Sequence, residues 1–248
     1  MKKIFYILLF LSQFIWANDL FEKGNDCYQK GKYQEAIQSY ESILAQGKES
    51  AEIYFNLGNC YYKLNRVAPA VFNFEKALLL NPNDVEIQNN LTFAKKMVID
   101  DIQEVPQVGF SKIIIDLTSV FHYDTWAWVS IVVAFCMLIC FIIYYYSYET
   151  ILKRIFFAGI LCSLCLVLLS LFAGFYEQSR LEKEKPAIVF VDVVNVKSEP
   201  NAVAANAFVL HAGTKVNIID HLDNYYKIQI ADLKEGWLNK SAIRKIKK

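Results

Sequence analysis

Two long uncharged stretches constrain this chain more than any other feature of its sequence. Residues 126–146 and 155–176 contain no Asp, Glu, Lys or Arg. At a rise of 1.5 Å per residue, each stretch as a helix covers the roughly 30 Å hydrocarbon core of a bilayer. Tryptophans begin the first stretch and tyrosines end it, as is typical of membrane–water interfaces. We therefore expect two transmembrane helices rather than two buried core helices.

The N-terminus has the pattern of a secretory signal peptide. Two lysines precede an apolar run over residues 4–16, which is too short to span a bilayer, and the small residue Ala17 follows. We expect a signal peptide at residues 1–17, with an uncleaved anchor as the alternative. Export of the segment behind it would leave the loop 147–154, with Lys153 and Arg154, in the cytoplasm. Both soluble regions would then lie outside.

Composition excludes several classes of function. The formal net charge is +1, so no basic field would attract nucleic acid. Cys162 and Cys165 spell C-x-x-C, but within a run of leucines a thiolate is poorly solvated, which favours apolar packing over redox or metal chemistry. The three histidines have no metal-ligand spacing, and no catalytic motif appears. We expect no cofactor, no metal and no enzymatic activity.

An internal repeat of 34 residues precedes the membrane segments. The shift superimposes Gly24 on Gly58, Ala36 on Ala70 and aromatic on aromatic positions. The second copy follows the pattern W-x2-L-G-x2-Y, A, F, A, P, so this region resembles the tetratricopeptide repeat family. We expect repeats at 17–50 and 51–84, with helices at 18–30, 33–46, 51–63 and 67–80. A polar-faced helix at 85–99 would cap the array, giving a region over 18–100.

The resemblance implies a groove that receives an extended peptide or a partner helix, lined by the first helix of each unit. Carrying the family's positions over gives the candidate residues Phe21, Asn25, Tyr28, Phe55, Asn56, Asn59, Tyr62 and Phe93. The alternative for each is a solvated or core-packing role. Where the carboxylate-clamp subgroup has basic residues, this chain has Phe21, Glu86 and Asn90, so such a clamp is not expected. Two repeats and a cap are near the lower limit of stability, which favours association with a partner or a second copy.

Residues 101–125 join the repeats to the membrane. They begin as a short linker, and apolar residues then recur at helical spacing from Phe110 to Phe121. Either a helix at the membrane interface or a core helix that packs on the repeats would explain this stripe.

The C-terminal region, residues 187–248, has the sequence pattern of a small β-domain. We expect strands at 187–196, 207–210, 215–221, 225–230 and 235–238, which suggests a small barrel. Gly213 would supply a turn of positive φ, and Gly236 would let the backbone turn before Trp237. The order of these segments resembles the bacterial SH3-like (SH3b) family, whose members bind cell-wall peptides or protein segments. Trp237 and Tyr226 are the candidate contact residues, with core packing as the alternative for Trp237.

The whole arrangement resembles the BatE proteins of the Bacteroides aerotolerance operon. The fold class is thus a multidomain membrane protein with an α-helical repeat solenoid, two transmembrane helices and an all-β SH3-like barrel. The resemblance implies a two-pass inner-membrane scaffold with both soluble domains in the periplasm. Its partners would be other Bat proteins, several with von Willebrand A domains, and a MoxR-type ATPase, in oxidative-stress tolerance. The alternative is an envelope protein that binds peptidoglycan and recruits a cell-wall enzyme.

Overall fold

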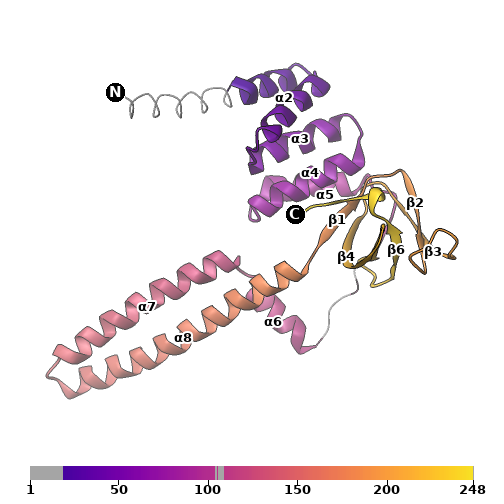
Figure 1. Cartoon of the computed structure of the whole chain (residues 1–248). Coiled ribbons are helices and arrows are strands. Elements are labelled where there is room, and N and C mark those ends of the chain that lie inside the picture. Colours follow the sequence, from indigo (N-terminus) through magenta and orange to yellow (C-terminus); the bar gives the residue numbers. More distant parts are fainter. Residues whose placement is uncertain (1–18, 104, 106–108, 248) are drawn as a thin grey trace, which may run out of the picture. The chain divides into compact units, whose positions relative to one another are not determined.

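The computed structural model describes residues 19–103, 105 and 109–247 (Figure 1). These residues form two compact units. The first unit combines the repeat region, through Val105, with the C-terminal region from Lys185 onward, and the second unit lies between them in the chain. The expected signal peptide at residues 1–17 lies outside the described residues.

The repeat region is a series of antiparallel helices. Residues 19–29 are helical, and four helices follow: α2 (Tyr33–Ala45), α3 (Ala51–Lys63), α4 (Val67–Leu80) and α5 (Val85–Lys95). A Cβ atom placed on Gly24 would lie 2.5 Å from the ring of Tyr40, and one on Gly58 would lie 2.7 Å from that of Phe74. The two glycines therefore allow each pair of helices to approach closely, as the repeat pattern predicts.

The C-terminal region is a seven-stranded antiparallel sheet. Its strands are β1 (Pro186–Val189), β2 (Val193–Lys197), β3 (Asn206–His211), β4 (Lys215–Leu222), β5 (Tyr225–Gln229), β6 (Glu235–Asn239) and β7 (Ile243–Lys245), and they pair in the order β3-β2-β6-β5-β4-β1-β7. A core of aliphatic side chains, including Val189, Leu210, Ile228 and Leu238, fills the domain.

The prediction of five strands is wrong in two places. The single strand expected at 187–196 is two strands, because β1 pairs with β4 and β7 whereas β2 pairs with β3 and β6. The mostly apolar sequence hides this break, since residues on both sides of it enter one core. Strand β7 was not expected at all. It is only three residues long and pairs with β1, more than fifty positions earlier in the chain.

The two glycines of this domain have different roles. Gly213 has a φ of +93°, as predicted for a turn. Gly236 lies inside β6 and does not turn the chain, which corrects the prediction. A Cβ atom there would lie 2.4 Å from Val196 of β2, so Gly236 permits these strands to pass closely.

The second unit contains α6 (Phe110–Thr118) and a hairpin of α7 (Tyr123–Tyr146) and α8 (Thr150–Lys183). The hydroxyl groups of Ser130 and Ser170 are 2.7 Å apart between the hairpin helices. Both helices are long and apolar enough to cross a membrane, and only 6% of the most apolar window of each is buried. Buried core helices would not expose so much apolar surface, so the architecture is that of a multidomain membrane protein.

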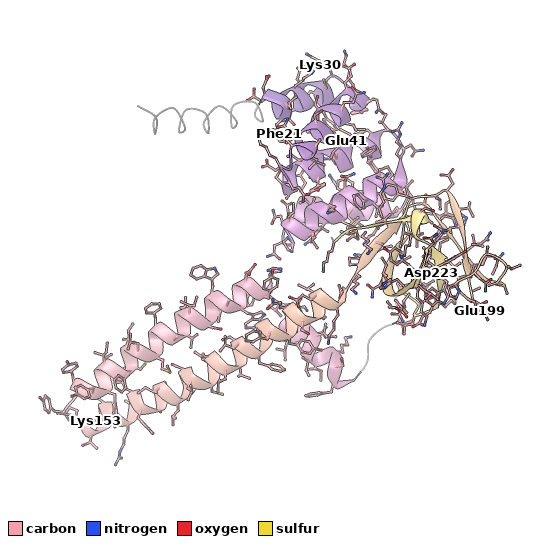
Figure 2. All side chains as sticks on the ribbon, in the orientation of Figure 1. Phe21, Lys30, Glu41, Lys153, Glu199 and Asp223 are labelled. Atoms are coloured by element: carbon pink, nitrogen blue, oxygen red, sulfur yellow. The ribbon has the colours of Figure 1, made fainter. Side chains whose placement is uncertain are left out.

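The hairpin turn is shorter than the expected loop. Residues 147–149 alone are non-helical, and residues 150–154 already belong to α8. Lys153 therefore lies in the first turns of that helix, at the end where the two helices of the hairpin are joined (Figure 2).

Candidate functional site

Four asparagines connect the first helices of successive repeat units. The Asn25 Oδ1 atom accepts hydrogen bonds from the Asn56 side-chain amide at 3.2 Å and from the Tyr40 hydroxyl at 2.6 Å. The Asn59 Oδ1 atom accepts one from the Asn90 amide at 3.0 Å. We call these four asparagines the amide face. Each pair leaves one amide nitrogen and one oxygen with no side-chain partner among the described residues, so the face retains both donors and acceptors.

Two phenylalanines flank the amide face at equivalent positions of the repeats. Phe21 packs on Tyr40, and Phe55 packs on Phe74, each with ring centroids 5.9 Å apart. Both phenylalanine side chains are half-buried. Each ring therefore contributes to the helix packing and still presents apolar surface.

The remaining candidate groove residues differ in exposure. Tyr28 is half-buried with its ring 5.3 Å from that of Tyr33, and burial raises the pKa of its hydroxyl. Tyr62 is half-buried against the core that includes α4. Phe93 on α5 is 51% exposed, so it is the most accessible of the candidate aromatic side chains. The Lys96 ammonium group lies over the Phe93 ring, 5.3 Å from its centroid.

The repeat region and the β-domain share a hydrophobic core, which the sequence did not predict. Ile188 of β1 and Ile246 are fully buried in one cluster with Ala68, Val71 and Leu91 of the repeats. Phe72 and Phe190 meet edge to face with centroids 5.5 Å apart. Gly213 lies so close to α4 that an added Cβ atom would be 2.7 Å from Val67. We call this contact the docking interface.

A half-buried carboxylate lies at one side of the docking interface. Asp100 accepts hydrogen bonds from the Thr214 hydroxyl at 2.5 Å and from the His211 backbone N–H at 2.7 Å, and its Oδ1 atom lies 2.6 Å from His211 Nδ1. Burial acts to raise the pKa of Asp100, but these hydrogen bonds outweigh burial, so the pKa is lower than its ordinary value. The ionised form of Asp100 is thus the one that holds the two regions together.

Glu75 of α4 provides a second polar contact. Its Oε2 atom lies 2.7 Å from the Lys215 ammonium group of β4, and its Oε1 atom lies 3.4 Å from that of Lys95. The Glu75 side chain is only 8% exposed. Glu75 thus links α4 to both α5 and β4 through ion pairs.

Sequence reasoning missed the docking interface because its members lie far apart in the chain. Asp100 and Thr214 are separated by 114 positions, and Glu75 and Lys215 by 140. In the sequence, Asp100 marks only the end of the region expected for the repeats. Hydrophobic periodicity describes one element at a time, and it contains no signal for a contact between two elements that each have their own pattern.

The candidate contact residues of the β-domain are Tyr226 and Trp237. The ammonium groups of Lys240 and Lys245 lie 5.0 and 4.8 Å from the centroid of the Tyr226 ring. Trp237 is half-buried on β6, opposite Lys227 of β5. Both aromatic residues therefore lie among lysines on the sheet.

The cysteines and acidic residues do not form a metal site in the described part of the chain, where no group of three or more His, Cys, Asp or Glu side chains could hold an ion. Cys162 and Cys165 are free and exposed on the surface of α8.

Three family matches agree with this geometry. Residues 24–65 match the family described as TPR repeat, and residues 51–84 match the tetratricopeptide repeat. Residues 192–244 match the bacterial SH3 domain. The chain therefore carries tetratricopeptide repeats and a bacterial SH3 domain.

Curated relatives are similar to part of this chain. The chain is 33% identical over 66 residues to an Hsp70-Hsp90 organizing protein of Triticum aestivum, a match that covers 27% of this chain and 11% of that protein. It is 31% identical over 75 residues to sperm-associated antigen 1 of Mus musculus, covering 30% and 8% of the two chains. The chain thus spans about a tenth of the length of these relatives.

Proposed function

We propose that this protein is a non-catalytic scaffold of a bacterial inner membrane that binds protein partners through its repeats. The amide face carries this proposal. Its unpaired amide atoms suit the backbone of an extended peptide, and the adjacent phenylalanines suit apolar side chains. The Hsp70-Hsp90 organizing protein, to which part of this chain is similar, is named for the two proteins that it organises.

The docking interface supports the proposed two-pass topology. The repeats precede α7 and the bacterial SH3 domain follows α8, yet they share one core. Two regions can pack together only on the same side of a membrane, so the chain must cross it an even number of times between them. Spans at α7 and α8 meet this condition. We place both regions in the periplasm because of the expected signal peptide.

The proposed partners are other Bat proteins, including those with von Willebrand A domains, in a complex with a MoxR-type ATPase that supports oxidative-stress tolerance. This part of the proposal rests on the order of the repeats, the membrane hairpin and the SH3 domain.

Site-specific crosslinking tests the proposal. A photoreactive amino acid at position 93 in the full-length protein should crosslink to protein partners in native membranes, because Phe93 is exposed beside the amide face. Asn56→Ala should remove these crosslinks, whereas Gln38→Ala on the exposed surface of α2 should not. Crosslinks that persist in Asn56→Ala would contradict the assignment of the groove.

Binding to cell-wall sacculi tests the alternative function. The detergent-solubilised full-length protein should not be retained by purified peptidoglycan if it is a protein scaffold. Retention that is lost in a Trp237→Ala variant but kept in Asn56→Ala would instead assign the SH3 domain to the cell wall.

A further inference from the structure

Helix α6 has three distinct faces. Ile114, Ile115 and Thr118 are the residues of the helix that are half-buried or buried, and α6 packs on α8. Lys112 and Asp116 lie on a second, polar face. Phe110, Ile113 and Leu117 are spaced i, i+3, i+7 and form a third face, where they are 76%, 55% and 64% exposed. Within its own unit, α6 therefore leaves its large apolar residues exposed, which a core helix would not do.

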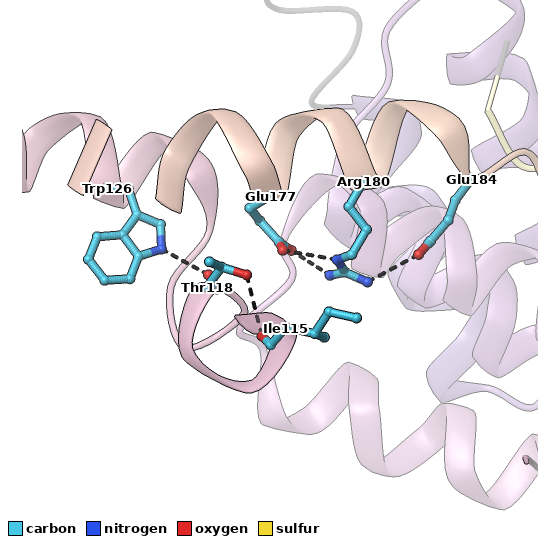
Figure 3. Close-up of polar contacts among 6 residues, drawn as sticks. All are labelled: Ile115, Thr118, Trp126, Glu177, Arg180 and Glu184. Atoms are coloured by element: carbon cyan, nitrogen blue, oxygen red, sulfur yellow. Dashed lines mark hydrogen bonds and ion pairs between the residues drawn. The ribbon is translucent and has the colours of Figure 1, made fainter. Parts of the chain in front are cut away.

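A hydrogen bond fixes α6 beside the first residues of α7. The Trp126 indole N–H donates to the Thr118 carbonyl oxygen at 2.9 Å (Figure 3). Thr118 ends α6, where backbone carbonyls have no partner within the helix, so the indole satisfies a group that would otherwise need water. Tryptophan prefers the membrane–water interface because its ring is apolar and its N–H is polar.

The charged residues near the C-terminal end of α8 mark the membrane–water interface, as Trp126 does. Glu177 immediately follows the uncharged stretch, and its carboxylate accepts two hydrogen bonds from Arg180 at 2.6 and 3.0 Å. Arg180 also donates to Glu184 at 3.1 Å (Figure 3). These three ion-paired residues mark where α8 leaves the hydrocarbon region of the membrane. Because α6 packs on α8 and is bonded to Trp126, it lies at the boundary between hydrocarbon and headgroups.

We infer that α6 is an interfacial helix whose exposed apolar face, Phe110, Ile113 and Leu117, inserts into the lipid leaflet. The occupant of this face is lipid because the face continues the lipid-exposed apolar surface of α7 and α8. Lys112 and Asp116 then face headgroups and water. The inference rests on the proposed membrane-spanning topology. It adds to the two spans a third helix that contacts lipid without crossing the bilayer.

Depth measurements by electron paramagnetic resonance test the inference. Nitroxides would be attached through p-acetylphenylalanine at positions 113 and 117, with positions 112 and 116 as matched controls on the polar face. This chemistry leaves the native cysteines untouched. In phosphatidylcholine nanodiscs, labels at 113 and 117 should collide several-fold more often with oxygen than with a water-soluble nickel chelate, and labels at 112 and 116 should show the reverse. Equal water exposure on both faces, or shielding of positions 113 and 117 from both reagents, would overturn the inference.

A second measurement needs no substitution. A phospholipid with a diazirine near the glycerol backbone should form adducts on the peptide that contains residues 110–118 of the natural chain, as well as on α7 and α8. Adducts on α7 and α8 alone would overturn the interfacial assignment of α6 while leaving the two spans intact. Absence of adducts on all three helices would instead refute the membrane topology itself.

Discussion

The docking interface and the amide face are two surfaces of one repeat region that are covered differently. At the docking interface, β-domain residues bury apolar side chains of α4, Lys215 pairs with Glu75, and Ile188 and Ile246 are almost fully buried. At the amide face, the asparagines are half-buried and Phe93 is exposed. Stability and partner binding are thus expected to depend on separate residues, and substitutions should separate them.

The largest expected effect is at Gly213. Gly213→Ala forces an L-residue into a φ of +93°, at a cost of roughly 1–2 kcal/mol. It also places Cβ 2.7 Å from Val67, and such overpacking costs about 1–3 kcal/mol. The free energy of unfolding should fall by roughly the sum of both terms. Pulse proteolysis of the full-length protein in urea would show this as a lower midpoint of unfolding.

Gly47→Ala is the matched control, because Gly47 has a φ of +76° but no atom within 4 Å of the added Cβ. It should show the conformational cost alone. Equal losses for the two variants would mean that Gly213 does not lie against the repeats.

Asp100→Asn should have the next largest effect. The substitution removes a charged acceptor that makes three close contacts. Hydrogen bonds to charged groups contribute roughly 1.5–3 kcal/mol each, and the asparagine amide would keep part of this bonding. We expect a net loss of about 2 kcal/mol near neutral pH. Asp101→Asn, at an exposed neighbouring position, should have no measurable effect.

The effect of Asp100→Asn should also depend on pH. The folded-state pKa of Asp100 lies below its ordinary value of 3.8, so its ionised form stabilises the fold at neutral pH and this contribution is lost as the pH falls through the folded-state pKa. The stability difference between the natural chain and the variant should therefore shrink below about pH 4. A difference that stayed constant down to pH 2 would exclude Asp100 as its source.

Lys215→Ala should cost less, about 1 kcal/mol, because Lys215 is 44% exposed and Glu75 keeps Lys95 as a partner. Lys234→Ala removes another lysine ion pair, with Asp232 at 2.7 Å, that lies outside the docking interface. That variant should unfold at the same urea concentration as the natural chain. Identical unfolding of both variants would show that the Glu75 contact adds nothing to docking.

Asn56→Ala should have the smallest effect on stability. Loss of the Asn56 amide leaves the Asn25 oxygen bonded to the Tyr40 hydroxyl, so the free energy of unfolding should change by less than about 1 kcal/mol. The same variant should nevertheless lose the crosslinks made from position 93. A large loss of stability in Asn56→Ala would show that the amide face serves folding rather than binding.

The helices could be predicted from the sequence because each follows a local rule. The 34-residue repeat and its glycines indicate the helices up to α4, and the uncharged stretches indicate α7 and α8. The limits of the strands could not be predicted in the same way. Strands β1 and β2 lie three residues apart in one mostly apolar segment, and they pair with different strands.

The candidate site could be predicted only in part. The equivalence of Phe21 and Phe55 follows from the repeat, and both pack on the equivalent aromatic residue of the second helix. The bonds between Asn25 and Asn56 and between Asn59 and Asn90 span 31 residues rather than 34, so the repeat shift alone does not reveal them. Asp100 gave no local signal, since its partners come from a domain that begins beyond the membrane helices.

The burial of Ile246 also has a consequence for how the protein is assembled. Ile246 is nearly the last residue of the chain, and its neighbours in the core include Ala68 and Val71 of α4. During synthesis, the flank of α4 therefore stays uncovered until both membrane helices and all seven strands have been made. A chain that inserted only one of the two helices would place Ile246 on the wrong side of the bilayer and leave that flank exposed. Completion of the core would thus distinguish correctly inserted chains from misinserted ones, which would expose an apolar surface to proteases.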